Sequence, residues 1–196
     1  FLAESDKVPE KDIPTSHQAG YIGVVIGAAL ATKQLPTDQL RELCQRIRFP
    51  IILLGGVQDR QRGEEIRSVE PEKIYNACGK FRLNESADLV RRARLIVTPD
   101  TGLMHIAAAF QKPVLSIWGN TIPEFGMYPY YGTAALDHSL ADYSAVKKLW
   151  CRPCSKIGYA RCPLGHFRCM RLQPVQELAH KVHQRLGIRN APVGGE

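Results

Sequence analysis

The stretch Leu95-Ile-Val-Thr-Pro-Asp-Thr-Gly-Leu-Met-His-Ile-Ala-Ala-Ala-Phe110 changes its periodicity halfway along, from that of a strand to that of a helix. The first three residues, Leu95 to Val97, are a continuous apolar run that predicts a buried strand. A Pro-Asp-Thr-Gly turn interrupts it at residues 99–102. From Leu103 to Phe110 apolar residues recur at i, i+3, i+4 and i+7, which predicts one buried face of a helix. The stretch is therefore a strand, a tight turn and a helix, the repeating unit of α/β sheets.

The start of the predicted helix favours an anion. Thr101 is the expected N-cap, which leaves the amides of Gly102, Leu103 and Met104 without intrahelical partners. Free amides and the helix dipole attract negative charge, and a glycine lets a ligand approach the backbone closely. Asp100 ends the strand, where open α/β sheets bind their ligands. We expect a negatively charged, hydroxyl-rich ligand such as a sugar nucleotide here. The alternative is an ordinary crossover in which Asp100 only caps the helix.

The rest of the chain repeats this alternation of strand and helix. The apolar run at 21–29 does not alternate with polar residues, so both of its faces should be buried, as in a parallel sheet. The pattern predicts an α/β fold with a Rossmann-like, doubly wound, mostly parallel sheet. Further strands are expected at 50–56, 73–79 and 113–119, helices after Pro36, at 62–69, at 84–92 (capped by Asn84) and from Pro174, and a loop at 120–131.

Composition divides the chain into four parts. Residues 1–20 are polar and contain two prolines, which is typical of a linker. Residues 21–146 form the expected nucleotide-sugar-binding Rossmann-like domain, 147–173 a basic cysteine-rich segment, and 174–196 a C-terminal helix and tail. The longest uncharged apolar run, 21–31, is well short of the roughly 20 residues that a membrane span needs. Since the chain has no initiating Met and opens without a secretory pattern, we expect a fragment of a longer protein.

Positive charge is concentrated near the C-terminus. The chain carries a net charge of +7, yet the stretch from Lys147 to Arg189 alone has ten Lys or Arg residues against one acid, Glu177, which gives 10 − 1 = +9. A basic block of this kind suits an anionic surface, such as a phosphorylated glycolipid, a membrane face or nucleic acid. A solvated basic face without a dedicated partner is the other interpretation.

The same region holds a cysteine cluster. Four cysteines follow the spacing C-x2-C-x7-C-x6-C, with His166 between the last two. Four thiolates, or three with an imidazole, would satisfy a tetrahedral structural zinc. Disulfides and reduced thiols that pack a small lobe are the alternatives, and disulfides require an oxidising compartment. The candidate ligands are Cys151, Cys154, Cys162 and Cys169.

The turn and the residues after it resemble a known family. Asp100-Thr-Gly-Leu-Met-His105, followed by Ile-Ala-Ala-Ala-Phe-Gln-Lys-Pro-Val-Leu-Ser-Ile-Trp-Gly119, is similar to the donor-binding half of a heptosyltransferase. This family belongs to the GT-B glycosyltransferases, which have two facing Rossmann-like domains, and it moves heptose from an ADP-sugar onto the inner core of lipopolysaccharide. The resemblance implies that the chain is the C-terminal, donor-binding half of such an enzyme.

The resemblance also assigns donor-binding roles. Lys33 matches a lysine in a Lys-x-x-Pro context that contacts the donor phosphates. Asp59 or Gln58 is placed where the family hydrogen-bonds the ribose, and Phe81 where it packs an apolar side chain on the base. The alternatives are a surface lysine, an aspartate that caps the next helix, a peripheral core phenylalanine and a helix-surface histidine without a role. The expected donor set is Lys33, Asp59, Phe81, Asp100, Thr101, Gly102, Leu103 and His105.

The chain departs from the family around Lys33. Relatives carry Ser or Thr hydroxyls shortly before this lysine and a Trp between it and the proline, whereas this chain has Ala28-Ala-Leu-Ala31 and Leu35. The polar contacts of this loop and the identity of the donor therefore stay open, and another nucleotide sugar, such as a UDP-sugar, is an alternative.

The resemblance further implies an inverting glycosyltransferase that needs no cofactor for transfer. Its catalytic base is an aspartate of the N-terminal acceptor domain, so no catalytic residue is expected in this chain, which should bind the donor without turnover. The expected partners are an ADP-heptose-like nucleotide sugar and, through the missing N-terminal domain, the lipopolysaccharide core. The expected location is the cytoplasm, with peripheral contact to the inner membrane.

A different class of function is a basic nucleic-acid-binding protein with a zinc-stabilised lobe. The basic block offers few aromatic residues for base stacking, chiefly Tyr159 and Phe167, so we expect no nucleic-acid partner.

Overall fold

A computed structural model describes residues 2–132 and 140–188 of the chain. Six parallel strands form one sheet in the order β3-β2-β1-β4-β5-β6. Because the order reverses between β1 and β4, the sheet is doubly wound and has its switch point there. The strands are β1 (Ile22–Val25), β2 (Ile51–Leu54), β3 (Ile74–Asn76), β4 (Leu95–Pro99), β5 (Val114–Trp118) and β6 (Ala141–Ala145).

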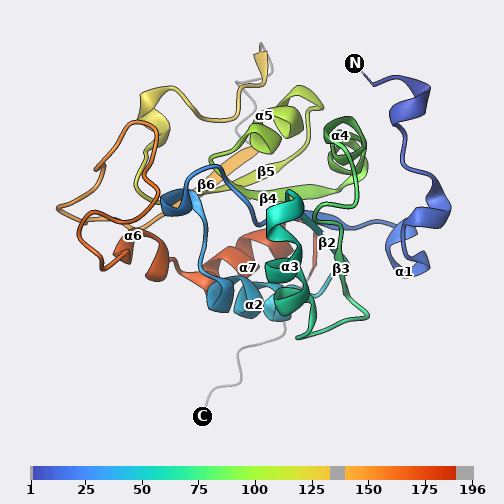
Figure 1. The fold of residues 1–196 in the computed structure, drawn as a ribbon, viewed down its shortest axis with the longest axis horizontal. Coiled ribbons are helices and arrows are strands. Elements are labelled where there is room, and N and C mark those ends of the chain that lie inside the picture. The colour runs from blue at the N-terminus through green and yellow to red at the C-terminus, as the bar shows by residue number, and fades with distance from the viewer. Residues whose placement is uncertain (1, 133–139, 189–196) are drawn as a thin grey trace.

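Helices cover both faces of the sheet. In Figure 1, α4 and α5 lie above the sheet, and α2, α3 and α7 lie below it. This three-layer arrangement confirms the predicted Rossmann-like α/β fold. The α-helices are α1 (Thr15–Gln18), α2 (Thr37–Arg46), α3 (Arg60–Arg67), α4 (Leu83–Arg92), α5 (Gly102–Ala109), α6 (Arg168–Arg171) and α7 (Val175–Arg185), and the 3-10 turns are η1 (Glu4–Asp6), η2 (Glu10–Asp12), η3 (Ala31–Lys33), η4 (Val57–Asp59) and η5 (Pro123–Phe125).

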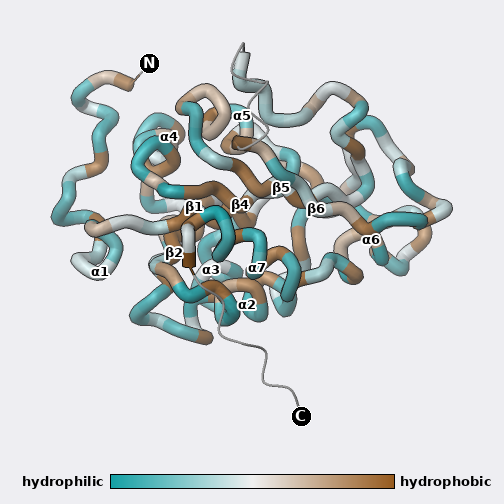
Figure 2. The backbone as a smooth tube through the Cα atoms, turned by 180° about the vertical axis from the view of Figure 1, so that it is seen from behind, coloured by the Kyte–Doolittle hydropathy of each residue, from teal (hydrophilic) through white to brown (hydrophobic). Residues whose placement is uncertain are grey.

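The central strands send alternate side chains into two separate cores. In β1, Ile22 and Val24 pack with α2 and α7, whereas Val25 packs with α4 and α5. Every residue of β1 is buried, as the unbroken apolar run predicts for a sheet covered on both faces. In Figure 2 the strands of the sheet are mostly brown, and much of the chain around them is teal.

The predicted strand–turn–helix arrangement at 95–110 is confirmed, with shifted bounds. β4 continues to Pro99, Asp100 and Thr101 form the turn, and α5 begins at Gly102 and ends at Ala109, with Phe110 as its C-cap. One helix begins earlier than predicted, and one strand was not predicted. The helix expected to be capped by Asn84 begins one residue earlier, at Leu83, and the amide of Arg82 donates to Glu85 Oε2 at 2.7 Å. The edge strand β6 has no counterpart in the sequence-based prediction, because Ala-Asp-Tyr-Ser-Ala lacks an apolar run.

Residues 2–20, predicted to be a linker, pack against the sheet. Val8 and Ile13 are buried in the core shared with α4 and α5. The ring of His17 lies within 3.1 Å of the carbonyl of Ile51 and 3.0 Å of that of Lys73, at the starts of two strands. The segment is therefore fastened to the domain.

Among the described residues, no helix is both long and apolar enough to cross a membrane. Of the predicted basic block, Arg189 lies outside the described residues, as does the tail at 189–196.

Candidate functional site

A crevice of about 550 Å³ opens at the switch point of the sheet. Its walls come from the segments that follow β1, β2 and β4, at their carboxyl ends, and from the start of α4. Five of the eight predicted donor residues line it, together with glycines and alanines of the neighbouring loops. These five are Asp59, Phe81, Thr101, Gly102 and Leu103.

The helix start on one wall has the predicted shape. Thr101 is the N-cap of α5, with extended backbone, although its side chain makes no capping bond and lies instead 3.2 Å from the hydroxyl of Thr98. The amide of Met104 is not free as predicted, because it donates to the carbonyl of Thr101 at 3.1 Å. A Cβ on Gly102 would meet nothing within 4 Å, so the protein itself does not require glycine there. The two amides left for an anion are those of Gly102 and Leu103.

The carboxylate of Asp59 forms the opposite wall. It is buried and accepts from the amide of Gly56 at 2.9 Å, so it caps the short turn η4 rather than α3. A Cβ on Gly27 would lie 2.2 Å from its Oδ2, and one on Gly55 would lie 2.8 Å away. Glycine is therefore needed at both positions to make room for this carboxylate.

Phe81 combines the two roles that the sequence left open. It lines the crevice and also packs against the core shared by α4 and α5. Ala28 and Ala29 line the crevice as well. Ser86 of α4 adds a hydroxyl to the lining that no sequence pattern had indicated.

Lys33 and Asp100 form an ion pair beside the crevice. Lys33 Nζ lies 2.7 Å from Asp100 Oδ2, and the two side chains are only 14% and 6% exposed. The hydroxyl of Thr121 donates to the same carboxylate oxygen at 3.3 Å. The structure thus brings together two residues that are 67 positions apart and were predicted separately. They form a partly desolvated ion pair in which Asp100 neutralises the charge of Lys33.

Arg62 of α3 fixes the loop that carries Lys33. Its guanidinium donates to the carbonyl of Ile26 at 3.0 Å, to the side chain of Gln34 at 2.9 Å and to the carbonyl of Leu35. Burial lowers the pKa of Arg62, and the nearby charge of Asp59 raises it. The sequence shows only a polar helix at this point, so no local signal could have identified this role.

The cysteine-rich segment, residues 147–173, docks on the same loop. The hydroxyl of Thr32 donates to the carbonyl of Tyr159 at 2.9 Å and accepts from its amide at 2.7 Å. A Cβ on Gly158 would come within 2.9 Å of Leu30 and 3.4 Å of Lys33. The segment therefore supports the Lys33 loop from outside.

Arg152 connects this segment to the end of β5. Its Nε donates to the carbonyl of Gly119 at 2.6 Å, and Nη2 donates to that of Thr121 at 3.0 Å. Burial lowers the pKa of Arg152, and the nearby carboxylate of Glu124 opposes this effect. Thr121 links Arg152 to Asp100, because its carbonyl accepts from Arg152 and its hydroxyl donates to the carboxylate of Asp100.

All four predicted metal ligands line one small cavity with His166 and Asn120. Cys151 Sγ lies 3.8 Å from His166 Nε2, and burial raises the pKa of Cys169 to about 11. No disulfide joins these cysteines, and within the described residues no three His, Cys, Asp or Glu side chains are arranged as ligands. Both side-chain polar atoms of Asn120 are buried without a hydrogen-bond partner.

His105 is a predicted donor-binding residue that lies neither in the crevice nor in the Lys33–Asp100 pair. It is exposed on α5 and does not line the crevice. Its role stays a prediction.

The strand order and the crevice at the switch point define a Rossmann-like α/β domain with the ligand-binding edge of that class. Residues 3–158 match the model of glycosyltransferase family 9 (heptosyltransferase), and the chain belongs to this family.

Two curated relatives show the extent of the match. The chain is 34% identical over 131 residues to the lipooligosaccharide heptosyltransferase 2 of Haemophilus influenzae, which covers 63% of this chain and 38% of the relative. It is 28% identical over 145 residues to the lipopolysaccharide heptosyltransferase 2 of Salmonella typhimurium, which covers 70% and 41%. The chain thus spans about two fifths of the length of these relatives.

Solved structures share the fold. The ADP-heptose lipopolysaccharide heptosyltransferase II of E. coli superposes with a TM-score of 0.66 at 22% identity, covering 85% of this chain and 46% of that one. The iron-containing heptosyltransferase TibC, solved with ADP-D-beta-D-heptose, superposes with a TM-score of 0.58 at 15% identity, covering 86% and 45%. The sheet and its helices therefore correspond to about half of each of these chains.

Proposed function

We propose that this chain is the C-terminal, donor-binding half of an inverting glycosyltransferase of lipopolysaccharide core synthesis, and that its donor is an ADP-heptose-like nucleotide sugar. The observation that carries the proposal is the crevice at the switch point, which unites Asp59, Phe81 and the α5 start beside the Lys33–Asp100 pair. Membership of the heptosyltransferase family and the solved neighbours named for ADP-heptose support the choice of nucleotide and sugar.

Each wall of the crevice suits one part of the donor. The ring of Phe81 can stack on the base, and the carboxylate of Asp59 can accept from ribose hydroxyls. The amides of Gly102 and Leu103 can donate to the diphosphate. Lys33 can leave Asp100 for a phosphate, which frees that carboxylate to accept from hydroxyls of the sugar.

The reaction itself needs a second domain. An acceptor hydroxyl attacks the anomeric carbon from the face opposite the nucleotide, and its proton passes to a carboxylate of the acceptor domain. The bond between the anomeric carbon and the phosphate oxygen breaks, and its electron pair leaves with ADP. This chain contributes orientation of the donor and, through Lys33 and the α5 amides, stabilisation of the charge on the departing diphosphate. No cofactor is required.

Calorimetry with ADP, UDP and GDP tests the proposal. ADP should bind with one site per chain and more tightly than the other two nucleotides, because the wall beside Phe81 is proposed to fit adenine, whereas the ribose and diphosphate contacts are common to all three. Preference for UDP would assign the same fold to a different sugar nucleotide. Binding of oligonucleotides with no response to any nucleoside diphosphate would replace the proposal with the nucleic-acid-binding alternative.

We also propose that Cys151, Cys154, Cys162 and Cys169 hold a structural metal ion, with zinc expected from their chemistry. These four cysteines line one cavity with His166 and with an Asn120 side chain whose polar atoms have no hydrogen-bond partner. The neighbour described as iron-containing makes iron the second candidate. Such a metal would hold the segment that supports the Lys33 loop and would take no part in transfer.

Metal analysis of the purified chain with a thiol count tests this proposal. One zinc or iron per chain, lost in a Cys162→Ser variant along with thermal stability, supports it. A metal-free chain with six reactive thiols after unfolding would establish free thiols, and fewer than six would establish a disulfide.

We place the protein in the cytoplasm with peripheral contact to the inner membrane, and its basic block toward the phosphates of the acceptor or of the inner leaflet. Within the described residues, no acid occurs between Lys147 and Gln176. Neutralising Lys147, Lys148, Arg152 and Arg168 together in an enzyme that carries both domains should weaken its binding to acceptor lipid. Unchanged binding would contradict this orientation.

A further inference from the structure

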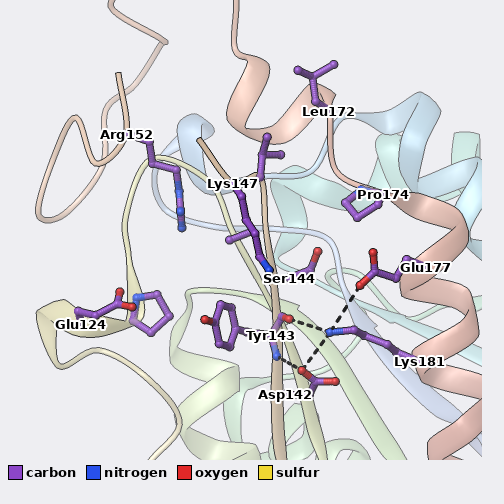
Figure 3. A pocket seen from close by; sticks show the side chains of 13 residues that line it. Glu124, Asp142, Tyr143, Ser144, Lys147, Arg152, Leu172, Pro174, Glu177 and Lys181 are labelled. Carbon is purple, nitrogen blue, oxygen red and sulfur yellow. Dashed lines mark hydrogen bonds and ion pairs between the residues drawn. The ribbon is translucent and has the colours of Figure 1, made fainter. Parts of the chain in front are cut away.

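A second cavity, the edge pocket, lies outside the proposed donor site. It measures about 580 Å³ and lies between η5, the last strand β6 and α7. Figure 3 shows Arg152 and Lys147 extending down toward Tyr143, with Glu124 to the left of the Tyr143 ring, on the same side as Arg152. None of these residues lines the crevice at the switch point.

Part of the lining is occupied by an internal charge network. Lys181 of α7 lies 3.1 Å from Asp142 Oδ1 and 3.9 Å from Glu177. Its ammonium also donates to the carbonyl of Tyr143 at 3.1 Å, and the amide of Tyr143 donates to Asp142 at 2.7 Å. Side chains therefore occupy both backbone polar groups at the centre of this sheet edge, which opposes the addition of another strand. A small molecule fits the pocket better than an extended peptide.

The remaining charges are left for a ligand. The exposed ammonium of Lys147 forms no ion pair with any residue that the structure describes. Two nitrogens of Arg152 are held by backbone carbonyls, and Nη1 makes no hydrogen bond within the same residues. Since Arg152 is already fixed by these bonds, little side-chain entropy is lost when it binds an anion. Glu124 and the hydroxyl of Tyr143 offer partners for hydroxyl groups.

The position of the pocket connects it to the donor site. Arg152 donates to the carbonyl of Thr121, whose hydroxyl donates to Asp100. Only the chain at residues 119–121 separates the cation from the carboxylate that is proposed to face the donor sugar. A molecule in the edge pocket would therefore lie beside the end of the donor where the new bond forms.

We propose that the edge pocket binds a phosphorylated sugar, with its phosphate on Arg152 and Lys147 and its hydroxyls on Glu124 and Tyr143. The identification of this ligand with a phosphate-bearing part of the acceptor rests on the proposed function. The binding chemistry itself does not depend on that function.

Amide chemical-shift mapping of the labelled chain with glucose 6-phosphate, inorganic phosphate and glucose tests the proposal. Glucose 6-phosphate should bind saturably and shift the amides around Tyr143 and Lys147, phosphate should do so more weakly, and glucose should have little effect. Shifts confined to Gly102 and its neighbours, or no saturable binding, would overturn the proposal. A parallel titration with ADP should shift Gly102, so failure of the donor site is recognised separately from failure of the edge pocket.

Three single-charge variants sharpen the test. Lys147→Gln should weaken the binding of glucose 6-phosphate about threefold or more, because a charge-assisted contact is lost. Glu124→Gln should strengthen the binding of inorganic phosphate, since a repelling carboxylate is removed. Lys156→Gln is the matched control, because Lys156 is exposed in the same basic segment but does not line the pocket. Equal losses for the two lysine variants would show general charge attraction and would contradict a built site.

Discussion

Gly102 is a position where the proposed ligand needs a glycine but the fold does not. Added methyl groups at Gly27 or Gly55 would collide with Asp59, whereas one at Gly102 would meet no atom within 4 Å. Alanine is also the better residue in a helix. We therefore predict that Gly102→Ala keeps or slightly raises the melting temperature while it weakens ADP binding by about tenfold or more, because the methyl group keeps the diphosphate from the α5 amides. Calorimetry and thermal melts of the same variant check both parts. If the ADP affinity is unchanged, the diphosphate does not bind at the α5 amides.

The Lys33–Asp100 pair predicts opposite effects from its two members. Lys33→Met should weaken ADP binding by about 10- to 100-fold, the range expected for one lost charge-assisted hydrogen bond. Asp100→Asn should strengthen ADP binding, since Lys33 no longer has to leave a carboxylate at 2.7 Å, and should weaken the preference for ADP-heptose over ADP. Calorimetry with both ligands measures these differences. If both variants weaken ADP binding alike, the pair serves the shape of the turn and not the ligand.

The sequence could predict Asp100 and the α5 start, because their chemistry is contained within a few consecutive residues. It could not predict that Asp100 is paired with Lys33, since that contact depends on how the loops after β1 and β4 meet across the switch point. Arg62 was missed for the same reason. Its partners lie 25 to 36 positions away, and its own surroundings read as a polar surface helix.

At the scale of elements, buried strands were predictable and the sheet edge was not. β1 and β2 are continuous apolar runs, and β4 and β5 each contain one polar residue, Thr98 and Ser116, so burial on both faces leaves a strong signal in all four. β6 is an edge strand that contains Asp142 and Tyr143. Its polar groups lie next to solvent and to α7, where Lys181 contacts Asp142, so the strand has no apolar run to predict it. The N-terminal segment was read as a linker because its buried residues, Val8 and Ile13, are isolated among charges, and only the sheet shows what they cover.

The attachment of that segment is predicted to depend on pH. Burial lowers the pKa of His17 below 6.5, against the effect of its contacts with the carbonyls of Ile51 and Lys73. A lowered folded-state pKa means that the unfolded segment binds protons more readily, so stability is complete above pH 6.5 and is lost as pH falls through the folded pKa. Hydrogen exchange of residues 2–20, corrected for intrinsic rates, should therefore rise between pH 7.5 and pH 5.

Two variants check the assignment to His17. His17→Gln keeps a donor near the two carbonyls and should remove most of the pH dependence. His105→Gln changes an exposed histidine on α5 and should leave it unaltered. If the exchange of residues 2–20 keeps its pH dependence in His17→Gln, another group controls the attachment.

At the level of the whole molecule, we predict that the chain binds the nucleotide donor but does not transfer its sugar, because the two functions belong to different domains. The crevice, the Lys33–Asp100 pair and the supporting cysteine-rich segment are complete within the described residues, so the chain should bind ADP on its own. At a hundredfold excess over its Kd, a ligand stabilises the folded state by about 2.7 kcal/mol. For a chain of this size, that corresponds to a rise of roughly 5–10 °C in melting temperature.

Because the proposed catalytic carboxylate belongs to the acceptor domain, the same chain should release no ADP from ADP-heptose in the presence of acceptor. Joining it to an acceptor domain should restore transfer, and turnover by the isolated chain would instead place the base among its own residues.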